Sequence, residues 1–332
     1  MEDGRKAAGR ALSMKVLTEE TLKKNVELSK YTTFGIGGPA QFMVEPRTME
    51  ELREALDFAE SEGLKVLPLG GGSDILVPDS GFRGLVIRFS RLSNVEIRGR
   101  KMVCEAGVYL QRLLNLAAKE GLSGLEPLAG IPGQLGGAIA KNAGSYGREI
   151  VELVRSVTIL TWDGEIVDTD TRELSIVYRG SRIPDLGLVV RVTLELAEGD
   201  AEKITAETEK FLERRKKEQP YGMRSAGCVF KNPENAEPAG YLLDKAGLKG
   251  FRIGDAAYSD IHAKIPAQWT LLSFVVVCAI FFGVAIYRRR LRWAAYGLGS
   301  WLVAVILVGA AFPAIVQRFQ VEPNELAREM PY

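Results

Sequence analysis

Hydrophobic and polar positions along the first 263 residues repeat with the periods of short strands and amphipathic helices. Thr48 and Glu51 form a capping-box pattern, apolar residues then recur on one helical face, and Gly63 ends the pattern, so a helix is predicted between Thr48 and Gly63. The same reasoning predicts helices at 110–120 and 200–217, strands at 65–69 and 188–197, and a hairpin of strands 156–162 and 165–169 joined by a type I′ turn at Asp163-Gly164.

The pattern changes at about residue 264. Residues 269–287 and 293–316 carry no charged side chain, and each run is long enough to cross the roughly 30 Å hydrocarbon core of a bilayer. The segment between them, 288–292, holds four arginines, and tryptophan and tyrosine flank both runs. Basic loops and aromatic ends are typical of membrane hairpins, so we predict a C-terminal two-helix transmembrane hairpin. The alternative is a pair of helices buried in a soluble core.

Composition narrows the function. The 332 residues suffice for two domains, and 43 Lys and Arg against 42 Asp and Glu give no surplus of positive charge for binding nucleic acid. A single histidine, His262, excludes the common zinc sites, so no metal is expected. Three separated cysteines exclude a disulfide framework, and residues 1–10 lack an apolar leader, so the first part of the chain is expected in the cytoplasm.

The average charge hides a difference between the two parts. Residues 1–263 carry a formal charge of −3, whereas residues 264–332 carry +4. We therefore expect a mildly acidic soluble protein joined to a basic membrane segment. The positive-inside rule would place the arginines of 288–292 in the cytoplasm and residues 1–263 outside, whereas the composition of residues 1–263 favours the cytoplasm.

Two glycine-rich segments carry the candidate chemistry. Residues 70–74 read Gly-Gly-Gly-Ser-Asp after a predicted strand, and residues 130–138 continue into 142–147. Without Cβ atoms, backbone N–H groups can converge on an anion, so the two segments could hold a pyrophosphate from two sides. The alternative is a pair of tight turns. Gly35-x-Gly37 superficially matches a dinucleotide fingerprint, but a strand-like segment follows, and we reject that match.

Five motifs in this order resemble the UDP-N-acetylenolpyruvoylglucosamine reductase family. They are Tyr31-Thr-Thr-Phe-Gly-Ile-Gly-Gly38, the Gly70 loop, the Gly130–Gly147 run, Tyr178-Arg179, and Gly227-Cys-Val-Phe-Lys-Asn-Pro233. The likeness covers about residues 16–263. It implies an α+β fold with a two-lobed FAD-binding unit of the vanillyl-alcohol-oxidase type. It also implies FAD, NADPH as hydride donor, a nucleotide-sugar substrate and a role in peptidoglycan precursor synthesis.

The resemblance implies the following division. Residues 1–28 form an N-terminal segment, 29–198 the FAD-binding domain, 199–263 a truncated α/β substrate-binding domain, and 264–332 the membrane hairpin with its tail. Membrane association through residues 269–316 is expected. The cofactor-binding residues implied are Gly70, Gly71, Gly72, Ser73, Asp74, Gly130, Ile131, Pro132, Gly133, Gly137, Asn142, Ala143, Gly144 and Tyr146.

The resemblance also implies catalytic and substrate-binding residues. Arg179 matches the family arginine, whose cation stabilises an enolate-like intermediate. Cys228 stands where the family usually has a proton-donating serine, and a thiol with an ordinary pKa of about 8.5 is the better acid. Tyr178, Lys231 and Asn232 match positions around the substrate. Without the resemblance, Cys228 would be interpreted as a small buried hydrophobic residue and Asn232-Pro233 as a plain turn.

The C-terminal part departs from this family. The family continues after Ala263 into a strand and helix that end with a catalytic glutamate, which has no counterpart here. Residues 313–319 and 321–326 instead resemble part of an uncharacterised family of multi-spanning bacterial membrane proteins. Two hypotheses follow: a reductase whose turnover is impaired, or a non-catalytic flavin-binding or membrane-associated chimeric protein.

Overall fold

The computed structural model describes residues 21–253, 256–262 and 266–267. The predicted spans 269–287 and 293–316 lie outside the described residues. Within the described part, no helix combines the length and apolar character needed to cross a bilayer.

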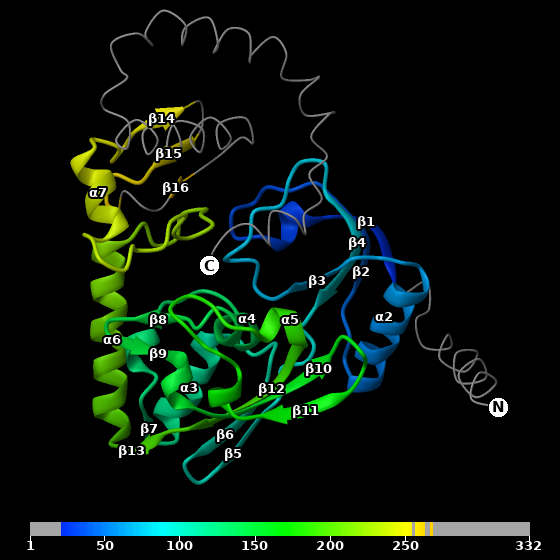
Figure 1. The fold of residues 1–332 in the computed structure, drawn as a ribbon. Helices are drawn as coiled ribbons and strands as arrows, with labels where there is room; N and C mark the ends of the chain where they lie inside the picture. The colour runs from blue at the N-terminus through cyan, green and yellow to red at the C-terminus, as the bar shows by residue number, and fades with distance from the viewer. Residues whose placement is uncertain (1–20, 254–255, 263–265, 268–332) are drawn as a thin grey trace, which may run out of the picture. The chain divides into compact units, whose positions relative to one another are not determined.

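The first sheet has four strands in the order β1-β2-β4-β3. β1 (Lys23–Glu27) is antiparallel to β2 (Pro39–Val44), whereas β3 (Val66–Leu69) and β2 both run parallel to β4 (Phe82–Arg88). The connection from β2 to β3 contains α2 (Met49–Ser61), which packs against β4 (Figure 1). This crossover places the end of β3, and therefore the first glycine segment, at one edge of the sheet.

The second sheet is antiparallel throughout, in the order β11-β10-β12-β6-β5. Its strands are β5 (Val95–Arg98), β6 (Lys101–Glu105), β10 (Val154–Thr161), β11 (Ile166–Thr169) and β12 (Gly187–Glu195). The two sheets give the predicted mixture of helices and strands. We call the first sheet with α2 the first lobe, and the second sheet with its helices the second lobe.

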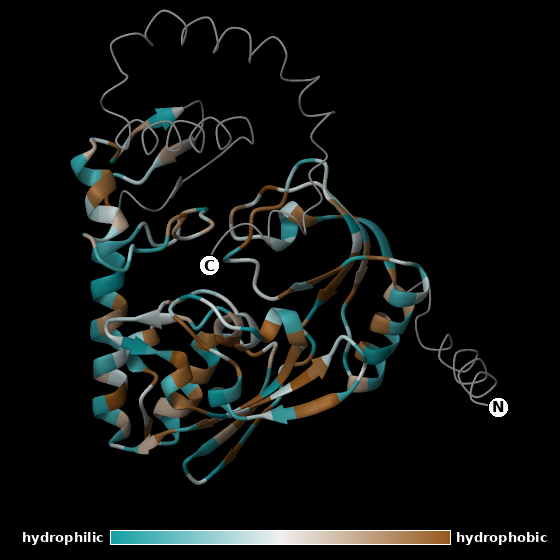
Figure 2. Ribbon diagram, in the orientation of Figure 1, coloured by the Kyte–Doolittle hydropathy of each residue, from teal (hydrophilic) through white to brown (hydrophobic). Residues whose placement is uncertain are grey.

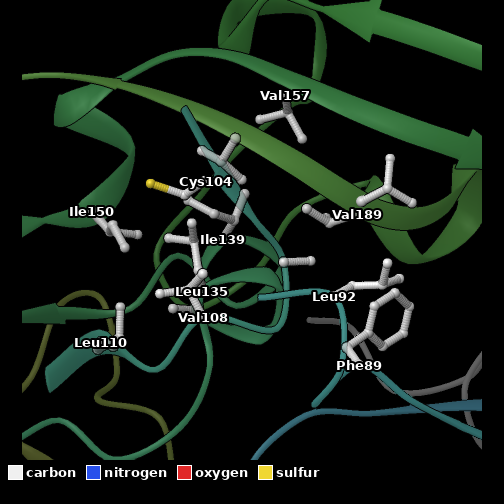
Figure 3. Packing of buried hydrophobic residues seen from close by; sticks show 14 of the residues in the cluster. Phe89, Leu92, Cys104, Val108, Leu110, Leu135, Ile139, Ile150, Val157 and Val189 are labelled. Carbon is white, nitrogen blue, oxygen red and sulfur yellow. The ribbon is translucent and has the colours of Figure 1, made fainter. Parts of the chain in front are cut away.

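The larger core contains the buried residues of the second sheet and of two helices, α3 (Leu110–Lys119) and α4 (Leu135–Ala140), and it continues into Leu52 of α2 and Leu85 of β4. α3 buries Leu110, Leu113, Leu114 and Ala117, the spacing of a single helical face. Figure 3 shows Leu110, Leu135 and Ile139 from these helices gathered with Cys104 of β6 and Val157 of β10. α4 lies within the second glycine segment, residues 130–147. The buried Leu135 and Ile139 of α4 therefore anchor that segment to the core.

The remaining elements are short apart from α6 (Ala201–Glu218), along which hydrophilic residues predominate (Figure 2). They comprise β7 (Leu122–Ser123), β8 (Gly144–Ser145), β9 (Arg148–Glu149), β13 (Ala197–Glu198), β14 (Arg252–Ile253), β15 (Ala256–Tyr258), β16 (Pro266–Ala267), α5 (Ile183–Leu186), α7 (Ala239–Lys245), and the 3-10 turns Leu28–Tyr31, Glu126–Leu128, Ile150–Leu153 and Thr171–Glu173.

The helices and strands predicted within residues 48–217 are confirmed, with two local corrections. The type I′ turn at Asp163-Gly164 is wrong: Gly164 has a positive φ of 83° but Asp163 does not, and Gly164 N–H donates to the Thr161 carbonyl at 3.0 Å. This is a three-residue loop closed by a left-handed glycine. The capping box is half formed, because Thr48 accepts from Glu51 N–H but the Glu51 carboxylate accepts from Arg47 N–H.

Candidate active site

The first glycine segment turns sharply after β3. Gly72 has φ of +67°, and a Cβ there would lie 2.0 Å from the Tyr31 carbonyl oxygen, so only glycine fits. Its own carbonyl accepts from Thr33 N–H at 2.9 Å. Residues 31–38 and 70–74, two of the motifs, are therefore in direct contact.

The second glycine segment meets the first. A Cβ on Gly71 would lie 3.0 Å from the Cα of Gly133, and a Cβ on Gly133 (φ +115°) would lie 2.8 Å from Ser73 Oγ. Ser73 Oγ also donates to the Pro132 carbonyl at 3.1 Å. Residues almost sixty positions apart in the chain thus bring their backbones together where no side chain separates them.

Other residues of the second segment differ in surroundings. Ile131 packs against the core, whereas a Cβ on Gly137 would meet no atom within 4 Å. Gln134, which precedes α4, is buried, lies against Gly70, and has neither amide atom hydrogen-bonded within the described chain. Native proteins rarely leave both atoms of a buried amide unpaired, so this loop suits a polar ligand.

Residues 142–146 form the far end of this segment. Asn142 is buried with φ of +45°, and its Nδ2 donates to Glu149 Oε2 at 2.7 Å and to the Val177 carbonyl at 3.2 Å. Ala143 is buried behind it. Tyr146 stacks on Phe211 of α6, with ring centroids 5.2 Å apart, and the Arg214 guanidinium lies 4.6 Å from the centroid of its ring.

Tyr178 and Arg179 occupy a tight turn. Val177 and Gly180 exchange both backbone hydrogen bonds, at 3.0 and 3.2 Å, and Arg179 has φ of +58°. A left-handed conformation at a non-glycine residue costs about 1–2 kcal/mol, so the surrounding structure must hold it. Arg179 Nη2 donates to the Gly144 carbonyl at 2.7 Å, which aims the guanidinium at the second glycine segment.

Asp74 links the first segment to this turn electrostatically. Desolvation raises the pKa of its carboxyl even though the side chain keeps exposed surface, and the charges of Lys141 and Arg179 oppose that rise. The two cations act on Asp74 because the loop ends and the Arg179 turn lie near one another.

The segment with Cys228 approaches the same loops. Thr33 Oγ1 donates to the Ser225 carbonyl at 2.9 Å, and a Cβ on Gly227 would lie 3.8 Å from the Ser73 carbonyl oxygen. Cys228 is exposed and lines a cavity of about 320 Å³ together with Asn232 and His262. His262 is half-buried at this cavity.

The substrate-binding candidates lie around this cavity and the turn. Tyr178 is exposed, and a Cβ on Gly180 would lie 4.0 Å from Lys231 Nζ. Asn232 Oδ1 accepts from Ala239 N–H at 3.2 Å, so its oxygen ties the loop to the start of α7.

Sequence reasoning missed three contributors, Thr33, Gln134 and Arg215. Thr33 joins two motifs by hydrogen bonds to Gly72 and Ser225. Arg215 is buried against the second glycine segment. Gln134 stood inside a quoted motif and could have been found, whereas nothing in the charged pattern of residues 200–217 distinguishes Arg215 from its neighbours.

Comparisons with known proteins agree with this geometry. A family model described as an FAD binding domain matches residues 40–170, and one described as an uncharacterised protein family (UPF0182) matches residues 236–332. The chain is 42% identical to the UDP-N-acetylenolpyruvoylglucosamine reductase of Moorella thermoacetica over 253 residues, covering 76% of this chain and 82% of that protein. It is 38% identical to the reductase of the same name from Clostridium novyi over 249 residues, 75% of this chain and 81% of that one.

A solved structure shows the same relationship. The crystal structure of UDP-N-acetylenolpyruvylglucosamine reductase from Thermus caldophilus matches with a TM-score of 0.66 and 37% identity, covering 74% of this chain and 88% of that one. Identity at this level over three quarters of the chain establishes common descent. The chain belongs to the UDP-N-acetylenolpyruvoylglucosamine reductase family.

Proposed function

We propose that this chain is an FAD-dependent reductase that uses NADPH to convert UDP-N-acetylglucosamine enolpyruvate into UDP-N-acetylmuramate, in the cytoplasm, for peptidoglycan precursor synthesis. The reductase name of its relatives supports the reaction, and the FAD family model spans both glycine segments. The observation that carries the proposal is the direct contact of the two glycine segments beside Arg179 and the Cys228 segment.

The residues present fit FAD. Close approach of Gly71 to Gly133 leaves no side chain between two runs of backbone N–H groups, the arrangement that suits a pyrophosphate. The unpaired amide of Gln134 and the open position at Gly137 fit a loop completed by a polar ligand. We propose residues 70–74 and 130–137 as the cofactor-binding segments, with 142–144 as the backbone that supports them.

We propose Arg179 and Cys228 as the catalytic residues. FAD, when bound, would take hydride from NADPH and pass it to the double bond of the substrate. The fixed guanidinium of Arg179 stabilises the negative charge that develops on the substrate carboxylate as the double bond is reduced. The Cys228 thiol then donates a proton to the substrate carbon, and its exposure beside the cavity supports this role.

The nucleotide-sugar would be held by Tyr178, Lys231 and Asn232. Lys231 supplies a cation beside the Arg179 turn, and the Asn232 oxygen, which accepts from Ala239 N–H, fixes the position of that side chain. Tyr146 is proposed as a cofactor-binding residue that also supports α6, because its ring stacks on Phe211. The proposed domains are 29–198 for FAD and 199–263 for the substrate, flanked by the segments 1–28 and 264–332.

A second candidate is a non-catalytic flavin-binding or membrane-associated chimeric protein. The match of residues 236–332 to an uncharacterised family favours it, as does the lack of a counterpart to the family glutamate after Ala263. For the same reason we expect lowered turnover in the reductase. Membrane association through residues 269–316 belongs to this candidate and would be measured by flotation of the full chain with lipid vesicles.

Turnover separates the two candidates. The FAD-loaded full chain is expected to oxidise NADPH more slowly than a relative such as the Moorella enzyme, but in dependence on UDP-N-acetylglucosamine enolpyruvate. The matched control is Arg179→Met, which should abolish the substrate-dependent part. Substrate-independent oxidation alone, in a chain that holds FAD, would contradict the reductase proposal and support the second candidate.

A further inference from the structure

Arg215 is an exception within its helix. α6 has 18 residues, of which only Ile204 and Arg215 are buried. The neighbouring Arg214 is exposed and pairs with Glu218 on the same helix at 2.8 Å. Arg215 is thus the one charged side chain of α6 that is buried. A role in keeping the helix soluble does not explain this burial.

The buried guanidinium bonds both ends of the second glycine segment. Arg215 Nε donates to the Ala129 carbonyl at 2.8 Å, and Nη2 donates to Ser145 Oγ. Ala129 directly precedes Gly130, and a Cβ on Gly130 would lie 2.8 Å from Arg215 Cδ. Gly130 is therefore needed for the arginine to pass, and the planar fork of the guanidinium suits two acceptors held at a fixed separation.

The same contacts lead to Arg179. Ser145 follows Gly144, whose carbonyl accepts from Arg179 Nη2 at 2.7 Å. Two guanidinium groups therefore hold adjacent residues of the short strand β8, one from α6 and one from the 177–180 turn. A shift of Ser145 would move the acceptor that orients Arg179.

The energetics oppose a purely stabilising role. Arg215 forms no direct ion pair with a carboxylate among residues 21–253, 256–262 and 266–267, although Glu218 lies near enough for the charge of Arg215 to help lower the pKa of its carboxyl. Burial lowers the pKa of Arg215, and the nearby charge of Arg179 also lowers it, yet an arginine stays charged at neutral pH. Buried charges of this kind are costly, and an apolar residue of similar volume would often stabilise the fold more.

We propose that Arg215 is a positioning residue: it clamps the two ends of residues 129–145 and thereby fixes both the second glycine segment and the acceptor of Arg179. The link to catalysis rests on the proposed function, whereas the clamp itself does not. Arg215 acts through Ala129, Ser145 and Gly144 and need not touch the substrate or the cofactor.

The test is hydrogen–deuterium exchange of the full chain, followed by FAD titration. Arg215→Met should accelerate exchange of the amides in 129–145 by about tenfold, the effect of one lost charge-assisted hydrogen bond, without changing the helical circular dichroism. Arg215→Lys should give nearly the same acceleration, because a point charge cannot bridge both acceptors. The matched control Lys216→Met should leave this segment unchanged, since Lys216 is exposed and pairs with Glu213 on the same helix at 2.7 Å.

FAD titration then tests the link to the site. Arg215→Met should raise the FAD dissociation constant about tenfold and alter the visible circular dichroism of the bound flavin, whereas Lys216→Met should do neither. Unchanged exchange in Arg215→Met would overturn the clamp, and faster exchange with unchanged FAD affinity would overturn its link to the cofactor site. A wild-type chain that binds no FAD would contradict the proposed function. The hydrogen–deuterium exchange result would still test whether Arg215 holds residues 129–145 in place.

Discussion

The two parts of the described chain bury their apolar side chains very differently. Between Leu28 and Leu196, buried leucine, isoleucine and valine residues form two clusters that fill both lobes. Between Tyr221 and His262 the buried apolar residues are Ala239, Leu243 and Tyr258, and large ones are exposed. The exposed ones are Tyr221, Met223, Tyr241, Leu242, Phe251 and Ile261, each between 39% and 53%.

The difference shows how the site is assembled. Arg179 and both glycine segments are held by the cores of the lobes, whereas Cys228 lies on a loop with little core of its own. That loop is attached through contacts with the first lobe, chiefly Thr33 with Ser225 and Gly227 near Ser73. The cofactor half of the site is therefore expected to keep its geometry when the Cys228 half opens.

The largest expected effect concerns the weakly packed half. Cys228→Ala should lower kcat by about 10²–10⁴-fold, the usual worth of a general acid, with FAD binding unchanged because the cofactor half is separate. Cys228→Ser should keep measurable activity, since a hydroxyl has similar reach. Stopped-flow reduction and single-turnover assays measure both; full rate in Cys228→Ala would remove the proton-donor role.

The next largest effect is expected from shortening an apolar side chain in the densely packed part of the chain, compared with the same change in the weakly packed part. Leu85→Ala, at a fully buried site in β4, should lower the free energy of unfolding by about 3 kcal/mol because it leaves a cavity. Leu242→Ala, at an exposed site on α7, should change it by less than about 0.5 kcal/mol. Urea unfolding measures both, and equal losses would show that the second half has a core as dense as the first.

A pair of glycines tests the cofactor half at finer scale. Gly133→Ala should destabilise the apo chain by about 1–3 kcal/mol, since φ is +115° and the new Cβ would lie 2.8 Å from Ser73 Oγ. Gly137→Ala meets no atom within 4 Å, so it should leave apo stability unchanged and weaken FAD binding instead. Unaltered FAD affinity in Gly137→Ala would place the cofactor away from that residue.

The smallest expected effect is the contribution of Glu45, in the first lobe, to the free energy of unfolding as the pH is changed. Burial raises the pKa of Glu45, but the Ser90 hydroxyl and the charges of Arg88 and Lys23 outweigh it, so the net pKa is lowered. A lowered folded-state pKa stabilises the fold above the unfolded pKa and loses that contribution as pH falls through the folded value. Glu45→Gln should therefore cost about 1 kcal/mol at pH 7 and almost nothing in acid.

The control for that titration is the exposed pair of Glu96 and Arg98. Glu96→Gln should change the free energy of unfolding by less than about 0.5 kcal/mol at pH 7, because both side chains are solvated. A deficit in Glu45→Gln that persisted unchanged in acid would contradict the assignment to a lowered carboxyl pKa.

Local pattern was enough to predict α2, α3, β3, β10, β11 and β12 in the first half, but β1, β4 and β5 were not predicted. Apolar periodicity predicted α2 and α3. Asp200 marked the predicted start of α6, and in the structure its carboxylate accepts a hydrogen bond from Lys203 N–H at 2.9 Å. The type I′ turn was wrong because Asp-Gly occurs both in two-residue type I′ turns and at the end of three-residue loops. The pairing of β10 with β11 includes Trp162 in the loop, which makes it a three-residue loop with a left-handed Gly164.

The site was predictable in its members but not in its contacts. Glycine runs and the family motifs pointed to residues 70–74 and 130–147, yet contact between Gly71 and Gly133 depends on how two sheets are connected. Arg215 could not be singled out, because a buried arginine and a solvated one look alike in a charged helix. Tyr146 stays a predicted cofactor-binding residue, and the structure adds that its ring stacks on Phe211.

The central claim is that the two glycine segments form a flavin dinucleotide site, and equilibrium titration of the purified full chain with FAD tests it most directly. We predict saturable binding of one FAD per chain, with quenched flavin fluorescence and a shifted visible spectrum, and loss of that binding in Gly133→Ala. A folded, colourless chain that leaves FAD fluorescence unchanged would contradict the account.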